Sequence, residues 1–230
     1  MIDTFMLDGK VITFREGQTV MTAAIDAGIY IPRLCFHPEF RPHGSCKLCT
    51  VRINGKRASS CTTPVAPDMV VESDTHEIND ERRMLLQMLF VEGNHFCPSC
   101  EQSGNCQLQA TAYELGMTSS RFDQFFPNRA VDASHPDYLL DFNRCILCSL
   151  CVQASRDVDG KSVFAFSMRG IHTRLIVNAG SGLLADTRFD GKDRAAGICP
   201  VGVIIKKRTG FKVPIGQRRY DTMSISSPEE

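Results

Sequence analysis

Eleven cysteines are the feature that most constrains this chain of 230 residues. An odd number cannot pair completely into disulfides, and the N-terminus lacks the basic and apolar segments of a secretory signal, so metal binding or catalysis explains them better. The cysteines fall into three groups separated by long cysteine-free stretches, as expected of separate metal sites. Eleven is one short of three sets of four ligands, so a twelfth ligand must be of another type.

The first group has the spacing Cys35-x10-Cys46-x2-Cys49-x11-Cys61. A plant-type [2Fe-2S] site also uses a Cys-x2-Cys pair and a distant last cysteine, although its first gap is shorter than the one here. The two-residue spacer lets both thiolates of the pair turn toward one point. A structural zinc site with four cysteines uses similar pairs and is the alternative for this group.

The third group is the most specific, because Cys145, Cys148 and Cys151 follow one another at intervals of three residues. Bacterial ferredoxins bind three irons of a [4Fe-4S] cluster with such a run, and in two-cluster ferredoxins the run continues to a fourth cysteine. That position is Ser155 here. The sequence therefore predicts a single [4Fe-4S] cluster with Cys199 as a remote fourth ligand.

The middle group, Cys97-x2-Cys100-x5-Cys106, has three thiolates and no further cysteine to complete a set of four. His95 lies two residues upstream, and an imidazole can replace a thiolate at iron, as it does in Rieske centres. The ligand count favours a [4Fe-4S] site with His95 as the fourth ligand. The alternative is an ordinary structural histidine beside a cluster with three protein ligands.

Composition and the remaining motifs argue against a substrate site in this chain. Lys and Arg together number 26, as do Asp and Glu, so no polyanionic partner is indicated. No apolar run is long enough to span a bilayer, and we expect a cytoplasmic protein. Gly180-x-Gly182-x2-Ala185 resembles a dinucleotide-binding turn, but residues 188–191 interrupt any following helix and no acidic residue lies about twenty positions further on. We therefore expect no catalytic residues and no nucleotide, flavin or nickel site.

The order of predicted elements indicates an α+β protein. Residues 1–76 combine a hairpin at 4–14, a helix at 18–27, a cysteine loop and a strand at 50–53, which fits a β-grasp [2Fe-2S] ferredoxin-like domain. Residues 77–118 read as a helical segment carrying the histidine-containing [4Fe-4S] site, with helices at 81–91 and 107–115. Residues 119–223 form a ferredoxin-like [4Fe-4S] domain that starts with a connector to 144 and has strands at 163–166 and 175–177. Residues 224–230 read as a flexible tail.

With this order of sites, the chain resembles the N-terminal module of the large iron-sulfur subunit of NADH:quinone oxidoreductase. Five segments between residues 31 and 205 carry the resemblance: IPRLCFHPEFRPHGSCKLCTVRING, SSCTTP, NHFCPSCEQSGNCQLQ, NRCILCSLCV and GICPVGVI. The long first gap is a feature of that family. In one departure, the larger relatives have His-x3-Cys before the middle cluster, whereas here a single residue separates His95 from Cys97. The large subunits continue into a molybdopterin-enzyme-like domain.

As a short version of this module, the chain is also similar to the diaphorase iron-sulfur subunit of cytoplasmic NAD-reducing nickel-iron hydrogenases. This subunit is of the gamma or U type. That resemblance implies one [2Fe-2S] and two [4Fe-4S] clusters that relay electrons between an NADH/FMN-binding diaphorase subunit and the hydrogenase small subunit, which contacts the large subunit. The complex would convert H2 and NAD+ to NADH and H+. Two alternatives are an electron-entry subunit of an NAD-linked formate dehydrogenase and a zinc-binding assembly factor.

Overall fold

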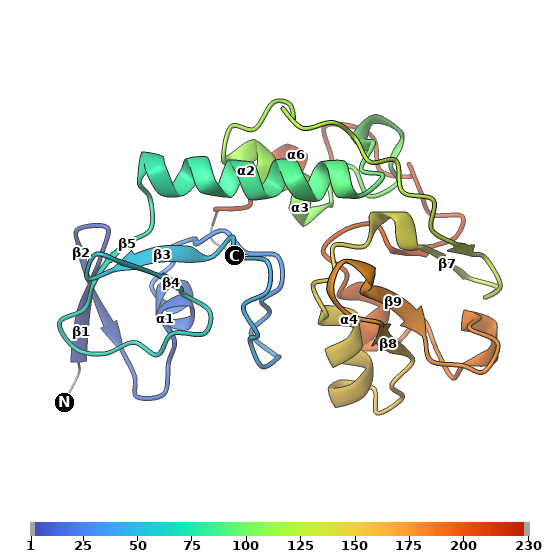
Figure 1. Ribbon diagram of the computed structural model, residues 1–230, viewed down its shortest axis with the longest axis horizontal. Helices are drawn as coiled ribbons and strands as arrows, with labels where there is room; N and C mark the ends of the chain where they lie inside the picture. The colour runs from blue at the N-terminus through green and yellow to red at the C-terminus, as the bar shows by residue number, and fades with distance from the viewer. Residues whose placement is uncertain (1–2, 228–230) are drawn as a thin grey trace.

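The computed structural model describes residues 3–227 and has the mixed α+β composition that the sequence predicts. Figure 1 shows a sheet at the N-terminal end, a long helix above it, and the C-terminal half at the other end of that helix. The strands are β1 Asp3–Leu7, β2 Lys10–Phe14, β3 Thr50–Ile53, β4 Lys56–Ser59, β5 Val70–Glu72, β6 Val131–Asp132, β7 Tyr138–Asp141, β8 Phe164–Ser167, β9 Arg174–Val177 and β10 Ile204–Lys206. The helices are α1 Val20–Asp26, α2 His76–Glu92, α3 Gln107–Glu114, α4 Leu150–Gln153, α5 Arg194–Gly197 and α6 Arg219–Thr222.

The N-terminal sheet has the strand order β2-β1-β5-β3-β4, in which β1 and β5 are parallel. The predicted hairpin is confirmed as β1 and β2, and its turn residues Asp8 and Gly9 have φ of 48° and 77°. Asn54 and Gly55 between β3 and β4 have φ of 47° and 81°. A turn with two successive residues of positive φ has a twist that matches the right-handed twist of the flanking strands. Asn or Asp followed by Gly adopts this conformation readily, which is why both turns use such a pair.

The predicted first helix is confirmed as α1, which begins after a capping box. The Thr19 hydroxyl accepts from the amide of Thr22 at 3.2 Å, and the Thr22 hydroxyl accepts from the amide of Thr19 at 2.8 Å. These bonds satisfy donors that the first helical turn leaves free. The helix buries Val20, Met21, Ala23 and Ala24 against the sheet.

The helix α2 begins five residues earlier than the 81–91 that the sequence predicts. Thr75 caps it, with its hydroxyl accepting from the amide of Ile78 at 3.2 Å, and Glu77 places a negative charge in the first turn. Its first turn is polar apart from Ile78, so apolar periodicity did not reveal it. The longer helix reaches from the N-terminal sheet to the loop of the middle cysteine group (Figure 1).

The segment 119–144, which the sequence suggested was a connector, contains β6 and β7, and this expectation was wrong. Leu140 of β7 pairs with Ile204 of β10, and β10, β7 and β6 form a three-stranded sheet. Strands of two to four residues show too few alternations to be recognised, and their pairing depends on a distant segment. The strands predicted at 163–166 and 175–177 are confirmed as β8 and β9, which pair antiparallel.

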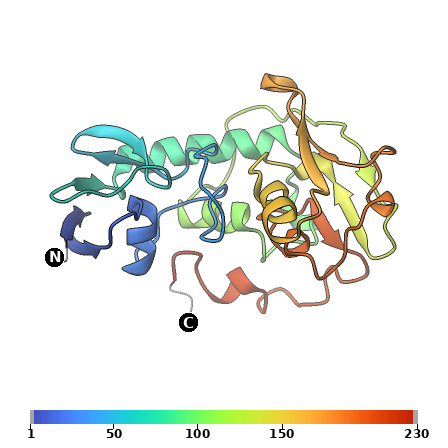
Figure 2. The same cartoon turned by 90° about the horizontal axis from the view of Figure 1, so that it is seen from below.

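The described part of the C-terminal segment contacts the rest of the protein. Figure 2 shows it running back from β10 toward the N-terminal half. The amide of Tyr220 donates to the carbonyl of Gly104 at 2.8 Å, and the Ser224 hydroxyl donates to the Glu114 carboxylate of α3. Of the tail predicted at residues 224–230, residues 228–230 lie outside the described residues.

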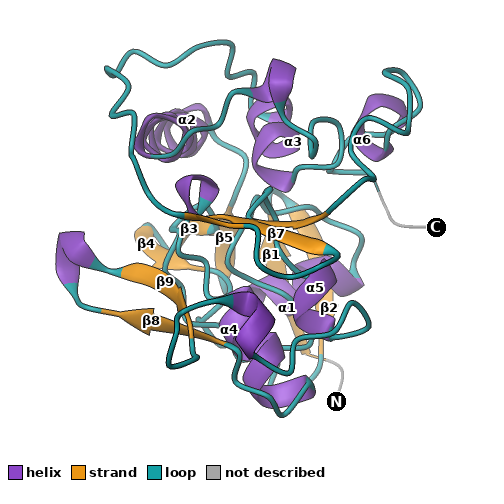
Figure 3. Ribbon diagram, turned by 90° about the vertical axis from the view of Figure 1, so that its right-hand side faces the viewer, coloured by secondary structure: helices purple, strands orange, loops and turns teal. Residues whose placement is uncertain are grey.

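One buried cluster joins the three cysteine groups. It contains Leu34, Cys35 and Leu48 from the first cysteine loop, Leu86 from α2, Leu108 from α3, and the buried side chains of the C-terminal half. Figure 3 shows α2 and α3 above β7 and α4 and α5 below it. This cluster therefore reaches all three cysteine groups, while Cys49 and Cys61 of the first group belong to a second cluster between α1 and the N-terminal sheet.

Candidate metal centres

The cysteines of the first group meet as two pairs. The amide of Cys46 donates to Cys35 Sγ at 3.4 Å, and Cys49 Sγ lies 3.3 Å from Cys61 Sγ. All but Cys46 are fully buried. In a four-cysteine [2Fe-2S] cluster each iron takes two thiolates, so a two-by-two arrangement fits this group well.

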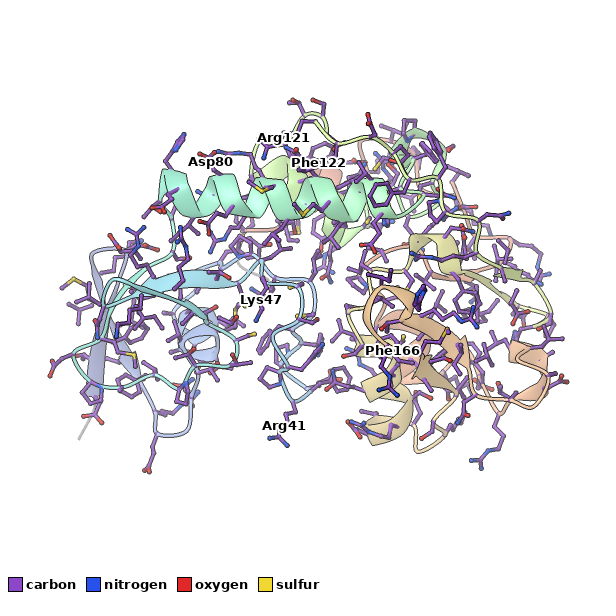
Figure 4. All side chains as sticks on the ribbon, viewed as in Figure 1. Arg41, Lys47, Asp80, Arg121, Phe122 and Phe166 are labelled. Atoms are coloured by element: carbon purple, nitrogen blue, oxygen red, sulfur yellow. The ribbon has the colours of Figure 1, made fainter. Side chains whose placement is uncertain are left out.

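Local backbone geometry explains how the first loop turns its sulfurs inward. Lys47, between Cys46 and Cys49, has a φ of 59°, which reverses the chain within the two-residue spacer. Figure 4 shows Lys47 beneath α2. The buried Ser60 hydroxyl donates to the carbonyl of Cys49 at 2.8 Å, and this bond fixes Cys49 beside the neighbouring Cys61.

The middle group and His95 line one small pocket. His95, Cys97, Cys100 and Cys106 all contribute to its wall. His95 Nε2 is buried and has no hydrogen-bond partner among the described residues. Buried polar atoms normally have a partner, so this lone nitrogen beside three thiols suits a metal ligand. The short His95-x-Cys97 spacing therefore still brings the histidine to the cysteines.

Electrostatics keep the imidazole neutral, which is the form that binds a metal. Burial, and then the positive charge of Arg144, lower the pKa of His95 to about 4. Gly93 makes room for the ring, because a Cβ at this position would lie 2.5 Å from His95 Nε2. The close approach of Gly93 to the ring could not be predicted from the sequence, because it depends on packing rather than on a turn conformation.

The third group surrounds a buried site at the start of α4. Leu147 and Ser149 have φ of 53° and 64°, so the chain curls around Cys148 between them. Electrostatic interactions link all four predicted ligands, of which Cys148 and Cys151 are buried and the other two are partly buried. These ligands are Cys145, Cys148, Cys151 and Cys199.

Ser155 has a structural role at the position where two-cluster ferredoxins carry another cysteine. Ser155 is 1% exposed, and its hydroxyl accepts a hydrogen bond from the amide of Val163 at 2.8 Å. Its carbonyl accepts from the amides of Lys161 and Ser162. The bonds anchor the loop that leads into β8, so this serine organises the backbone.

Burial makes the free thiols weak acids in the middle and third groups. It raises the pKa of Cys106 to about 12 and that of Cys145 to about 11, and it also raises the pKa of Cys148 and Cys151. Thiolates are the form that ligates iron, so a bound cation must displace these protons. A buried set of thiols is costly to ionise unless positive charge enters with it.

Contacts between the loops place the third group between the other two. The Ser149 hydroxyl lies 3.3 Å from His43 Nε2 of the first cysteine loop. On the other side, Arg144, next to Cys145, donates to Cys100 Sγ of the middle group at 3.5 Å. The spatial order of the groups is therefore first, third, middle, which differs from their order along the chain.

Two properties of the described residues 3–227 bear on the class of site. No three His, Cys, Asp or Glu side chains converge closely enough to hold a single metal ion. Ligands of a polynuclear cluster bind different irons and stand further apart, which is consistent with this arrangement. Across the same residues, no helix has the length and apolar character to span a membrane.

Three family descriptions match successive parts of the chain. Residues 4–76 match the 2Fe-2S iron-sulfur cluster binding domain. Residues 82–121 match the NADH-ubiquinone oxidoreductase-G iron-sulfur binding region, and residues 139–205 match the 4Fe-4S single cluster domain. The chain therefore contains a [2Fe-2S] domain followed by [4Fe-4S] binding regions.

Similar proteins cover nearly the whole chain. The gamma subunit of the NAD-reducing hydrogenase HoxS of Cupriavidus necator is 42% identical over 95% of this chain and 93% of its own length. The mitochondrial NADH-ubiquinone oxidoreductase 78 kDa subunit of Candida albicans is 30% identical over 95% of this chain, which spans 31% of that longer protein. A chain in the crystal structure of a NAD+-reducing [NiFe]-hydrogenase in the H2-reduced state superposes with a TM-score of 0.95 at 52% identity, over 99% of this chain and 97% of that chain. This chain belongs to the family of the gamma subunits of NAD-reducing hydrogenases, iron-sulfur electron-relay subunits of an oxidoreductase complex.

Proposed function

We propose that this chain holds three iron-sulfur clusters and relays electrons between an NADH/FMN diaphorase subunit and the small subunit of a nickel-iron hydrogenase. The observation that carries the proposal is the pocket in which the unpartnered His95 nitrogen and three cysteines share one wall. The proposed [2Fe-2S] ligands are Cys35, Cys46, Cys49 and Cys61. The proposed [4Fe-4S] ligands are His95, Cys97, Cys100 and Cys106 for one cluster, and Cys145, Cys148, Cys151 and Cys199 for the other.

The matched family regions also support the proposed division of the chain. They begin and end close to the boundaries of the predicted units 1–76, 77–118 and 119–223, apart from the connector that opens the last unit and residues 206–223 that close it. Each unit supplies one ligand set. We propose that the units remain fixed relative to one another, because a single buried cluster of side chains runs through all three cysteine groups.

When bound, the clusters supply one-electron transfer, and the residues of this chain hold them, exclude water and set their charge environment. The spatial order of the ligand groups supports a path from the [2Fe-2S] site through the third group to the middle group. The contacts between His43 and Ser149 and between Arg144 and Cys100 mark the two steps of this path. Neither contact could be predicted from the order of the cysteine groups along the chain.

Reduction by NADH tests the proposed function. We expect the isolated, reconstituted chain to stay oxidised with NADH, and its clusters to become reduced after addition of a purified NADH/FMN diaphorase subunit. Within a complete complex, H2 should reduce the same clusters through the hydrogenase module. Reduction of the isolated chain by NADH, or no reduction by either donor in an active complex, would contradict the relay.

A further inference from the structure

A buried arginine lies next to the proposed [2Fe-2S] site. Arg82 on α2 is 2% exposed. Its Nε donates to the carbonyl of Leu48 at 2.9 Å, and Nη2 donates to the carbonyl of Thr50 at 3.0 Å. Its remaining hydrogen bonds go to the carbonyl and hydroxyl of Ser73 and to the side-chain oxygen of Asn79. Every acceptor is therefore neutral.

Such a cation is expensive to bury without a counter-charge. Transfer of an ion into a protein interior costs several kcal/mol even after relaxation, and buried charges are normally paired. Among residues 3–227, no carboxylate forms an ion pair with Arg82. Burial lowers the pKa of Arg82 to about 10. The hydrogen bonds satisfy its donors but leave its charge unbalanced.

The position of the guanidinium points to the missing charge. The carbonyls of Leu48 and Thr50 flank Cys49, which is 1% exposed. A [2Fe-2S] cluster with four thiolates is negatively charged, because thiolates and sulfides outweigh two ferric ions, and reduction adds a further electron. A fixed positive charge beside it therefore favours the reduced state, and a site of low dielectric strengthens that effect.

We propose that Arg82 is the buried counter-ion of the [2Fe-2S] site and raises its reduction potential, in addition to fixing the Cys46–Cys49 loop to α2. The inference rests on the proposed function, because it requires the cluster at Cys35, Cys46, Cys49 and Cys61. Reduction adds one electron to the cluster, and Arg82 keeps its proton throughout. Arg82 is thus a positioning and potential-setting residue that does not ligate iron.

Redox titration of the reconstituted full-length chain, followed by electron paramagnetic resonance of the [2Fe-2S] signal, tests the proposal. Arg82→Gln removes the charge. At the potential where the wild-type cluster is half reduced, we expect the ratio of reduced to oxidised cluster in this variant to be at least tenfold lower than in the wild type. A tenfold change is about 59 mV for a one-electron couple. Arg82→Lys keeps the charge with fewer donors, so its midpoint should stay close to that of the wild type.

The neighbouring Arg83 gives a matched control. Its guanidinium pairs with Asp80 and donates to the carbonyl of Leu115 at 3.1 Å, and Figure 4 shows Asp80 on the face of α2 away from Lys47. Arg83→Gln changes the net charge by the same amount on the same helix. It should leave the [2Fe-2S] midpoint unshifted, and all variants should leave the two [4Fe-4S] midpoints in place.

Each outcome decides the question. Equal midpoints for the wild type and Arg82→Gln would overturn the counter-ion, as would equal shifts in Arg82→Gln and Arg82→Lys. If the cluster assembles in Arg82→Lys and not in Arg82→Gln, the charge is required and the proposal stands. If neither variant assembles it, the hydrogen-bond geometry is what matters and the proposal fails. Absence of a [2Fe-2S] signal in the wild type would instead contradict the proposed function itself.

Discussion

Arg144 donates a hydrogen bond to the sulfur of Cys100 at 3.5 Å, although it is the immediate neighbour of Cys145 in a different cysteine group. Its Nη1 also lies 2.8 Å from the Glu101 carboxylate and its Nε 2.8 Å from that of Asp141. The side chain is 15% exposed. One cation therefore connects the third and middle groups, at the place where electrons would pass between them.

Replacement of Arg144 should lower the potential of the middle [4Fe-4S] cluster. Hydrogen bonds and positive charge at a cluster sulfur stabilise its reduced form, so Arg144→Gln removes a stabilising influence. We expect a shift on the order of tenfold in the ratio of reduced to oxidised cluster, or about 59 mV, by redox titration. Arg121→Gln is the control, because Arg121 is exposed and lies over the Phe122 ring, on the face of α2 away from Lys47 (Figure 4). Equal effects of both replacements would show that net charge alone is responsible.

Gly93→Ala should damage the middle cluster selectively. Its Cβ would lie 2.5 Å from His95 Nε2, which forces the imidazole out of its present position. Overpacking of this kind costs about 1–3 kcal/mol and here falls on a proposed ligand. Loss of one [4Fe-4S] signal in the magnetic resonance spectrum is expected, with the other two retained. Gly180→Ala is the matched control, since no atom lies within 4 Å of the added Cβ. An intact spectrum for Gly93→Ala would remove His95 from the site.

His95→Cys should lower the potential of the middle cluster and leave the others nearly unchanged. A thiolate in place of a neutral imidazole adds negative charge, which makes the addition of an electron harder, the reverse of the shift seen in Rieske centres. His95→Ala should give a labile or three-iron cluster. Redox titration distinguishes this from a structural histidine, for which both replacements would produce small effects spread over all three clusters.

Cys199→Ser should destabilise the third cluster and preserve the [2Fe-2S] signal. Cys199 contributes to the group of Cys145, Cys148 and Cys151, whereas Cys49 and Cys61 belong to a separate pair. Electron paramagnetic resonance of the reduced variant measures both sites together. Simultaneous loss of both signals would mean that the shared core cannot form without the third cluster.

Cysteine spacing predicted the ligand groups because a two-residue spacer is a local feature that the sequence displays directly. The hairpin at Asp8 and Gly9 was predictable for the same reason, since the turn depends on those two residues. The position of β7 was not, because its pairing with β10 joins residues more than sixty positions apart in the chain. A four-residue strand carries too little periodicity to reveal such a partner.

The charged residues around the sites were also beyond sequence analysis. Arg82 follows other charged residues at the start of α2, and nothing in that run shows that it alone is buried. Arg144 precedes a predicted ligand, yet its contact with Cys100 bridges two loops. Burial and long-range contact decide both roles. The spatial order of the three groups was missed for the same reason.

Metal and sulfide analysis of the anaerobically purified full-length chain tests the central claim most directly. The three ligand sets predict about ten irons and about ten acid-labile sulfides per chain, two, four and four in the three clusters, with little zinc. A preparation dominated by zinc, or one with about two irons in intact protein, would contradict the three-cluster relay.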